Sequence, residues 1–156
     1  MSFVCFVAFV VASALFALST PGNASDTTSM SQGAGLILLV EDEAKFREPL
    51  EHLLRQRSYE VIAADAVDTA LEALHGRRPD AAIVDLNLRH GSGRDVIVRV
   101  PSTAPVIIFS GMRSASGELE RLRPRTRLIE KPYSLVLLVE TLEEMLAESN
   151  SQNLHP

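Results

Sequence analysis

The chain has 156 residues, of which 46% are hydrophobic and 22% are charged. This length predicts one domain with appendages, and the apolar content is sufficient for a core, which excludes disorder for most of the chain. The net charge of -5 and the lack of a basic cluster argue against nucleic-acid binding, and the single cysteine, Cys5, excludes a disulfide framework and a cysteine-rich metal site.

The first part of the chain is an almost entirely apolar segment, residues 2–18, followed by a linker rich in Ser, Thr, Gly and Asn. Three interpretations are open. The segment has the length of a cleaved signal sequence or of a membrane anchor, although no Lys or Arg precedes it and the next basic residue is Lys45. Alternatively, translation begins at Met30. In each case residues 1–35 are expected to lie outside the fold.

From Leu36 onward, apolar runs of strand length alternate with segments of helical periodicity. The predicted strands span residues 36–40, 60–64, 81–88, 106–109 and 127–130. The predicted helices span residues 44–57, 67–74, 96–100, 116–122 and 135–146, with Pro49 inside the first and Asp65 and Ser134 as possible caps.

Strands that alternate with helices in this way predict a doubly wound five-stranded parallel sheet flanked by five helices, because parallel neighbours need a crossover helix each time. Prolines restrict the third and fourth helices to short lengths. We expect this single domain to span residues 36–148, followed by a polar tail at residues 149–156.

The third predicted strand, Ala81 to Leu88, contains an unexpected carboxylate, Asp85. A run this apolar is typical of a strand buried on both faces of a parallel sheet. A carboxylate near the carboxyl end of such a strand lies where open α/β sheets bind their ligands. Taken alone, Asp85 could equally be a solvated residue at the end of a strand.

Polar side chains follow four of the predicted strands, and in a parallel sheet these four strand ends lie along one edge. We therefore expect the following residues to converge: Glu41, Asp42, Asp85, Asn87, Ser110 and Lys131. Three carboxylates that lie close together repel one another unless a cation lies among them, and carboxylate and carbonyl oxygens suit Mg²⁺. A lysine and a hydroxyl group supply what a transferred phosphoryl group needs.

The motifs at these strand ends resemble those of the receiver domain of two-component response regulators. They are Val40-Glu41-Asp42-Glu43, Val84-Asp85-Leu86-Asn87, Ile108-Phe109-Ser110-Gly111 and Glu130-Lys131-Pro132-Tyr133. The resemblance covers residues 36–146 and implies a flavodoxin-like fold of the receiver type. It also implies a bacterial, cytoplasmic signalling protein rather than an enzyme, which accepts phosphate from a sensor histidine kinase or histidine phosphotransfer protein and acts on a downstream protein without an output domain of its own.

The resemblance also implies a role for each residue at the strand ends. Asp85 is the implied phosphoacceptor. Asp42, Asp85 and the backbone carbonyl of Asn87 would ligate Mg²⁺, and Glu41 would reach the ion mainly through water. Ser110 would be the switch hydroxyl, and Lys131, with an expected cis bond to Pro132, would pair first with Asp85 and then with the phosphoryl group. Gly93 matches the loop glycine of the family.

The sequence departs from the family pattern at two positions. Leu128 stands where many members have the Tyr or Phe that moves inward on phosphorylation, and Arg89 stands where a proline is common. Two alternatives to the phosphoacceptor therefore stay open. One is a pseudo-receiver that acts as a docking module. The other is a Mg²⁺-dependent phosphatase, which would need an aspartate at the position of Asn87.

Overall fold

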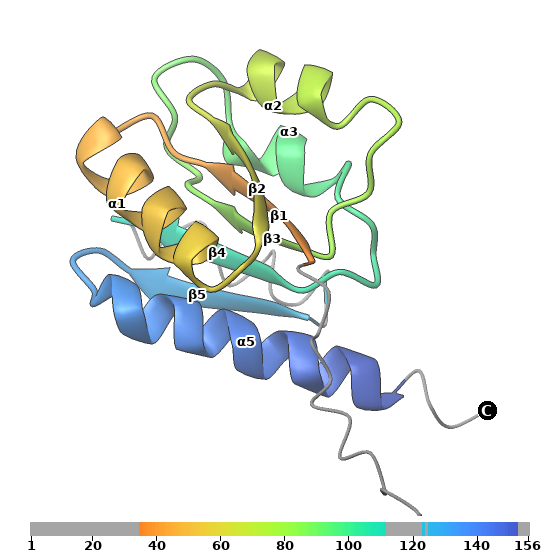
Figure 1. Ribbon diagram of the computed structural model, residues 1–156. Helices are drawn as coiled ribbons and strands as arrows, with labels where there is room; N and C mark the ends of the chain where they lie inside the picture. Colours follow the sequence, from red (N-terminus) through yellow and green to blue (C-terminus); the bar gives the residue numbers. More distant parts are fainter. Residues whose placement is uncertain (1–34, 112–122, 124, 153–156) are drawn as a thin grey trace, which may run out of the picture. The chain divides into compact units, whose positions relative to one another are not determined.

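The computed structural model describes residues 35–111, 123 and 125–152. Five parallel strands form one sheet in the order β2-β1-β3-β4-β5 (Figure 1). The strands are β1 (Leu36–Val40), β2 (Glu60–Ala64), β3 (Ala81–Val84), β4 (Val106–Ser110) and β5 (Thr126–Glu130). The predicted doubly wound parallel sheet is confirmed, and the carboxyl ends of all five strands lie at one edge.

Among the described residues, helices cover both faces of this sheet (Figure 1). Helices α1 (Ala44–Gln56) and α5 (Leu135–Gln152) lie on one face, and α2 (Val67–Ala73) and α3 (Gly93–Ile97) lie on the other. The fourth predicted helix, at residues 116–122, lies outside the described residues, as does the apolar segment at residues 2–18. Among the described residues, no helix is long and apolar enough to cross a membrane.

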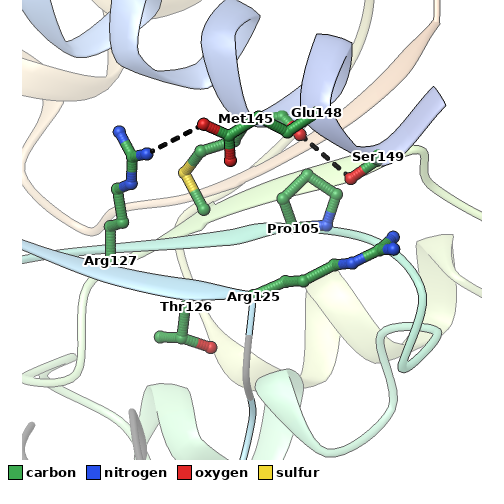
Figure 2. A pocket seen from close by; sticks show the side chains of 7 residues that line it. All are labelled: Pro105, Arg125, Thr126, Arg127, Met145, Glu148 and Ser149. Carbon is green, nitrogen blue, oxygen red and sulfur yellow. Dashed lines mark hydrogen bonds and ion pairs between the residues drawn. The ribbon is translucent and has the colours of Figure 1, made fainter. Parts of the chain in front are cut away.

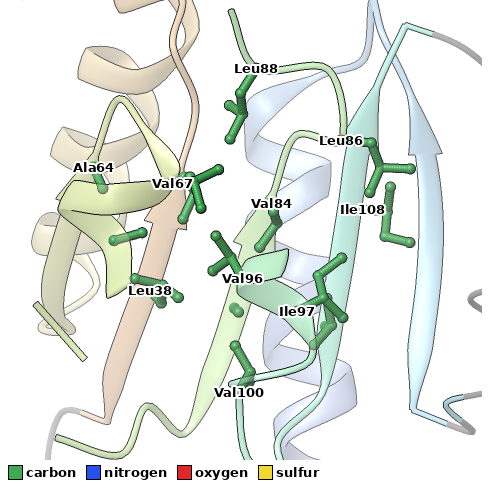
Figure 3. Packing of buried hydrophobic residues seen from close by; sticks show 14 of the residues in the cluster. Leu38, Ala64, Val67, Val84, Leu86, Leu88, Val96, Ile97, Val100 and Ile108 are labelled. Carbon is green, nitrogen blue, oxygen red and sulfur yellow. The ribbon is translucent and has the colours of Figure 1, made fainter. Parts of the chain in front are cut away.

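The core consists of two apolar layers separated by the sheet, because successive side chains of each buried strand point to opposite faces. Figure 3 shows the layer under α2 and α3, where Val84 and Ile108 from the strands meet Val96 and Ile97 of α3. In the other layer, Phe109 packs with residues of α1 and α5 such as Leu50 and Leu142. Full burial of each such side chain contributes about 1.5–3 kcal/mol to stability.

Four details of the secondary structure differ from the sequence-based expectations. Helix α3 spans Gly93–Ile97 instead of residues 96–100, because its polar first turn is capped by Ser92 and carries no apolar periodicity. Strand β3 ends at Val84 instead of Leu88, so Asp85 is the first residue beyond the strand. Helix α2 is preceded by Ala66 and has no side-chain cap, so the prediction of a cap by Asp65 is wrong. Helix α5 continues to Gln152, where the hydroxyl groups of Ser149 and Ser151 donate to carbonyl oxygens one turn earlier.

The remaining local predictions hold. Helix α1 is continuous through Pro49, and the Lys131–Pro132 peptide bond is cis. The Ser134 hydroxyl accepts a long hydrogen bond of 3.5 Å from the amide of Leu137 in the first turn of α5.

Candidate functional site

The turn after β1 places two carboxylates at the sheet edge. Glu41 is only 1% exposed, and its amide donates to the carbonyl of Ala64 at 3.0 Å, so the residue continues the pairing with β2. The guanidinium of Arg47 in α1 donates to the carbonyl of Glu41 at 2.8 Å. Burial raises the pKa of Glu41, although the contact with Lys131 opposes this effect.

Asp85 lies beside this turn, directly after β3. Its amide donates to the carbonyl of Val40 at 2.9 Å, and its Oδ1 accepts a 2.9 Å hydrogen bond from the amide of Asn87. The residue is 5% exposed. The carboxylate is therefore held in one orientation by its own loop and has little contact with solvent.

Gly93 allows α3 to begin against the backbone of Asp85. A Cβ atom at Gly93 would lie 2.0 Å from the Asp85 carbonyl oxygen and 2.8 Å from Cγ1 of Val84. These distances are far below van der Waals contact, so only glycine fits without displacing the backbone. The resemblance to the receiver family predicts a loop glycine at this position, and the close approach explains why a glycine is needed.

Lys131 places its ammonium group between the two buried carboxylates. Its Nζ lies 2.6 Å from Oε2 of Glu41 and 2.7 Å from Oδ2 of Asp85, and its side chain is 9% exposed. The backbone amide of Lys131 donates to the carbonyl of Ser110 at 3.0 Å, which fixes the turn after β5. Burial alone would lower the pKa of Lys131, but the contacts with Asp85 and Glu41 raise it above its usual value.

Two aromatic rings enclose the same ammonium group. Nζ of Lys131 lies 4.7 Å from the ring centre of Phe46 and 5.1 Å from that of Phe109. The two rings meet edge to face with their centres 5.9 Å apart. Since both ring faces attract a cation, the rings favour a charged lysine at this position. The contact between Phe46 and Lys131 joins residues far apart in the sequence, so no local pattern predicts it.

Ser110 and Asn87 interact directly at the edge of the site. Nδ2 of Asn87 donates to Oγ of Ser110 at 3.0 Å, and Ser110 is fully buried. Asn87 therefore links the Ser110 hydroxyl to Asp85, because its own backbone amide donates to Oδ1 of Asp85. Leu128, at the position where an aromatic residue is common, is partly buried and packs against the layer under α2 and α3.

Asp42 is paired with a residue that the sequence analysis did not place in the site. Both the backbone amide and Nε of Arg89 lie 3.2 Å from Oδ2 of Asp42. The Asp42 side chain is 10% exposed, whereas that of Arg89 is 73% exposed. The two residues are 47 positions apart in the sequence, so no local pattern could have indicated this contact.

The three carboxylates form a set of donors that suits a hard divalent cation. One oxygen each of Glu41, Asp42 and Asp85 lies within 4.8 Å of the others. The donors are all oxygens, and two of the three carboxylates are buried. These are properties that Mg²⁺ sites share, since this ion binds a few carboxylate oxygens and keeps several waters. The donor set therefore fits Mg²⁺.

A cavity of about 330 Å³ lies at the opposite edge of the sheet, where β4 and β5 begin (Figure 2). Arg127, which lines it, is already paired with Glu148 at 3.4 Å and Glu144 at 3.5 Å, and the guanidinium of Arg125 donates to the carbonyl of Thr103 at 2.8 Å. The guanidinium groups of Arg125 and Arg127 therefore already have partners within the protein. The polar residues that converge at the ends of the strands lie at the other edge of the sheet.

Comparison with known proteins agrees with the resemblance of the strand-end motifs. A family model described as "Response regulator receiver domain" matches residues 37–143. The transcriptional regulatory protein KdpE of Mycobacterium tuberculosis is 37% identical over 89 residues, which cover 56% of this chain and 39% of KdpE. The matched part of the chain thus spans about two fifths of the length of that relative.

Solved structures show the same fold. A CheY-like response regulator receiver domain protein from Methanospirillum hungatei superposes with a TM-score of 0.67 at 21% identity, over 76% of this chain and 98% of that chain. The non-phosphorylated HemR receiver domain from Leptospira biflexa superposes with a TM-score of 0.63 at 28% identity, over 72% of this chain and 94% of that chain.

Proposed function

This chain belongs to the response regulator receiver domain family, and we propose that it accepts a phosphoryl group on Asp85 in a Mg²⁺-dependent reaction. Receiver domains are signalling domains that interact with histidine kinases or phosphotransfer proteins, and they bind Mg²⁺ in general. The proposal rests above all on one observation. A buried carboxylate, Asp85, lies within 2.7 Å of Lys131, whose side chain is 9% exposed, and within 4.8 Å of two further carboxylates.

In the proposed reaction, a carboxylate oxygen of Asp85 attacks the phosphorus atom of a phosphohistidine. The bond between phosphorus and the histidine nitrogen breaks, its electron pair stays on that nitrogen, and an acyl phosphate forms on Asp85. The amide of Asn87 holds Oδ1 of Asp85 in place at 2.9 Å, which orients the nucleophile before the donor arrives. Lys131 is the cation that pairs with the new phosphoryl oxygens.

We propose that Asp42, Asp85 and the backbone carbonyl of Asn87 hold Mg²⁺, with Glu41 acting mainly through water. When bound, the ion offsets the negative charge of the carboxylates and the phosphoryl oxygens. Ser110 is the proposed switch residue. Its Oγ accepts from Nδ2 of Asn87 at 3.0 Å, so the hydroxyl proton is free to donate to the phosphoryl group. A shift of Ser110 towards the phosphoryl group would change the surface that a partner protein contacts.

Incubation with acetyl phosphate and Mg²⁺ tests the proposal directly. Intact-mass measurement is expected to show one added phosphoryl group on the wild-type protein, none on the Asp85→Asn variant and none in EDTA. A wild-type protein that gains no mass would support a docking module without phosphorylation. Turnover of a generic phosphate ester would instead support a phosphatase, although Asn87 occupies the position where a second aspartate would be needed.

The proposed phosphodonors, histidine kinases and phosphotransfer proteins, act in the cytoplasm, so we propose that this reaction takes place there. Mass spectrometry of the protein isolated from cells would identify the mature N-terminus. That result would decide among a signal sequence, an anchor and translation from Met30.

A further inference from the structure

Arg89 is the surface residue that contacts the proposed metal site most directly. Its Nε and its backbone amide both lie 3.2 Å from Oδ2 of Asp42. The backbone contact fixes the loop between β3 and α3 on this carboxylate. The guanidinium lies on the solvent side, with 73% of the side chain exposed, so it can leave without disturbing the core.

The carboxylates of the site have two different positive partners within the protein. The Lys131 side chain is 9% exposed, and its Nζ lies within 2.7 Å of both Glu41 and Asp85 and beside two aromatic rings. The ammonium group of Lys131 is thus the positive partner of both buried carboxylates. Asp42, the third member of the set, takes its positive partner from Arg89 instead. Two protein cations therefore offset three carboxylates when no ion is bound.

We propose that Arg89 is a built-in counter-ion that sets how tightly this site holds a divalent cation. The inference rests on the Mg²⁺ site of the proposed function. Without a metal ion, the guanidinium offsets the charge of Asp42 and so relieves its repulsion from Glu41 and Asp85. A divalent cation that binds Asp42 meets a positive group already in contact with the same carboxylate, and it must displace the guanidinium or tolerate the repulsion.

The size of the effect follows from the exposure of the pair. Asp42 and Arg89 are separated by 3.2 Å, but solvent surrounds most of the guanidinium and screens its charge. We therefore expect removal of the charge to tighten Mg²⁺ binding by roughly three- to tenfold at low salt. The effect should shrink as ionic strength rises, because screening weakens the repulsion between exposed charges most.

Isothermal titration calorimetry with MgCl₂ on the full-length chain tests this inference. The Arg89→Gln variant removes the charge, and Arg89→Lys keeps it. Arg77→Gln is the matched control, since Arg77 pairs with Glu60 at the start of β2, at the opposite edge of the sheet, and its loss changes the net charge by the same amount. Only Arg89→Gln is expected to bind Mg²⁺ more tightly than the wild-type protein.

A second measurement uses thermal unfolding in EDTA, which reports on the metal-free state. Arg89→Gln is expected to lower the Tm in EDTA, and added Mg²⁺ should recover more stability in this variant than in the wild type. Equal or weaker Mg²⁺ binding by Arg89→Gln would overturn the inference and leave the proposed function intact. Failure of the wild-type protein to bind Mg²⁺ would overturn both.

Discussion

Replacement of Gly93 with alanine tests how closely α3 must approach Asp85. The added Cβ would lie 2.0 Å from the carbonyl oxygen of Asp85 and 2.9 Å from its carbonyl carbon. Relief of the first contact requires the two backbone segments to move apart by about 1 Å, since Cβ atoms essentially never come closer than about 3 Å to another heavy atom. Because both clashing atoms belong to the backbone, a change of side-chain rotamer cannot absorb the shift.

Overpacking of a well-packed core usually costs about 1–3 kcal/mol, and a clash with the main chain places Gly93→Ala near the upper end of that range. At about 4 °C per kcal/mol for a domain slightly longer than 100 residues, the Tm should fall by roughly 8–12 °C. Thermal and urea unfolding followed by circular dichroism would measure the loss. Phosphorylation by acetyl phosphate should also slow at temperatures where the variant stays folded, because Asp85 itself moves.

Gly111→Ala is the matched control for this variant. No atom of the described residues lies within 4 Å of a Cβ built at Gly111, and that residue does not have a positive φ. The control should change the stability by less than about 1 kcal/mol. If Gly93→Ala were as stable as Gly111→Ala, the proposed close packing of α3 against Asp85 would be refuted.

Substitutions at three further residues probe the charges of the site. Because the folded state raises the pKa of Glu41, the ionised carboxylate opposes folding, and its neutral form is favoured at low pH. Glu41→Gln should therefore raise the Tm in EDTA at pH 7, and the difference from wild type should vanish as the pH falls towards 4.5. Lys131→Met leaves two buried carboxylates without their cation and should cost about 3–5 kcal/mol in urea unfolding at pH 7; a cost below about 1 kcal/mol would contradict the buried ion pairs. Phe46→Leu removes the ring above the Lys131 ammonium and should lower the free energy of unfolding by about 1 kcal/mol. Phe46→Tyr keeps an aromatic ring and should not lower it. Equal losses in both variants would indicate that the ring acts through packing alone.

Much of this fold could be predicted from the sequence because its strands are continuous apolar runs with polar ends. The apolar run Leu36–Val40 ends directly before Glu41, so both the strand and the first site residue follow from one pattern. The parallel arrangement then placed Asp85 and Lys131 at the same edge, although they lie on different strands. These predictions needed only periodicity and the geometry of a parallel sheet.

The features that the sequence did not predict depend on contacts between distant residues. The contact of Arg89 with Asp42 and the enclosure of Lys131 by Phe46 and Phe109 depend on how loops and helices dock. The extension of α5 to Gln152 was missed for another reason. Its last residues are polar, so the apolar spacing that marks a helix stops before the backbone hydrogen bonds do.

Arg123 limits where this protein can be cut or extended in engineering. The segment between α3 and β4 resembles a short surface loop that would tolerate an inserted peptide. Its carbonyl groups, however, accept hydrogen bonds from the Arg123 guanidinium, at 3.2 Å from Ile97, 3.1 Å from Val100 and 2.8 Å from Ala104, and Pro101 is a fourth acceptor. An insertion at residues 98–104 would separate these acceptors from one another. A reporter or a permuted terminus placed in this loop would therefore disturb Arg123 as well, and with it the start of β5.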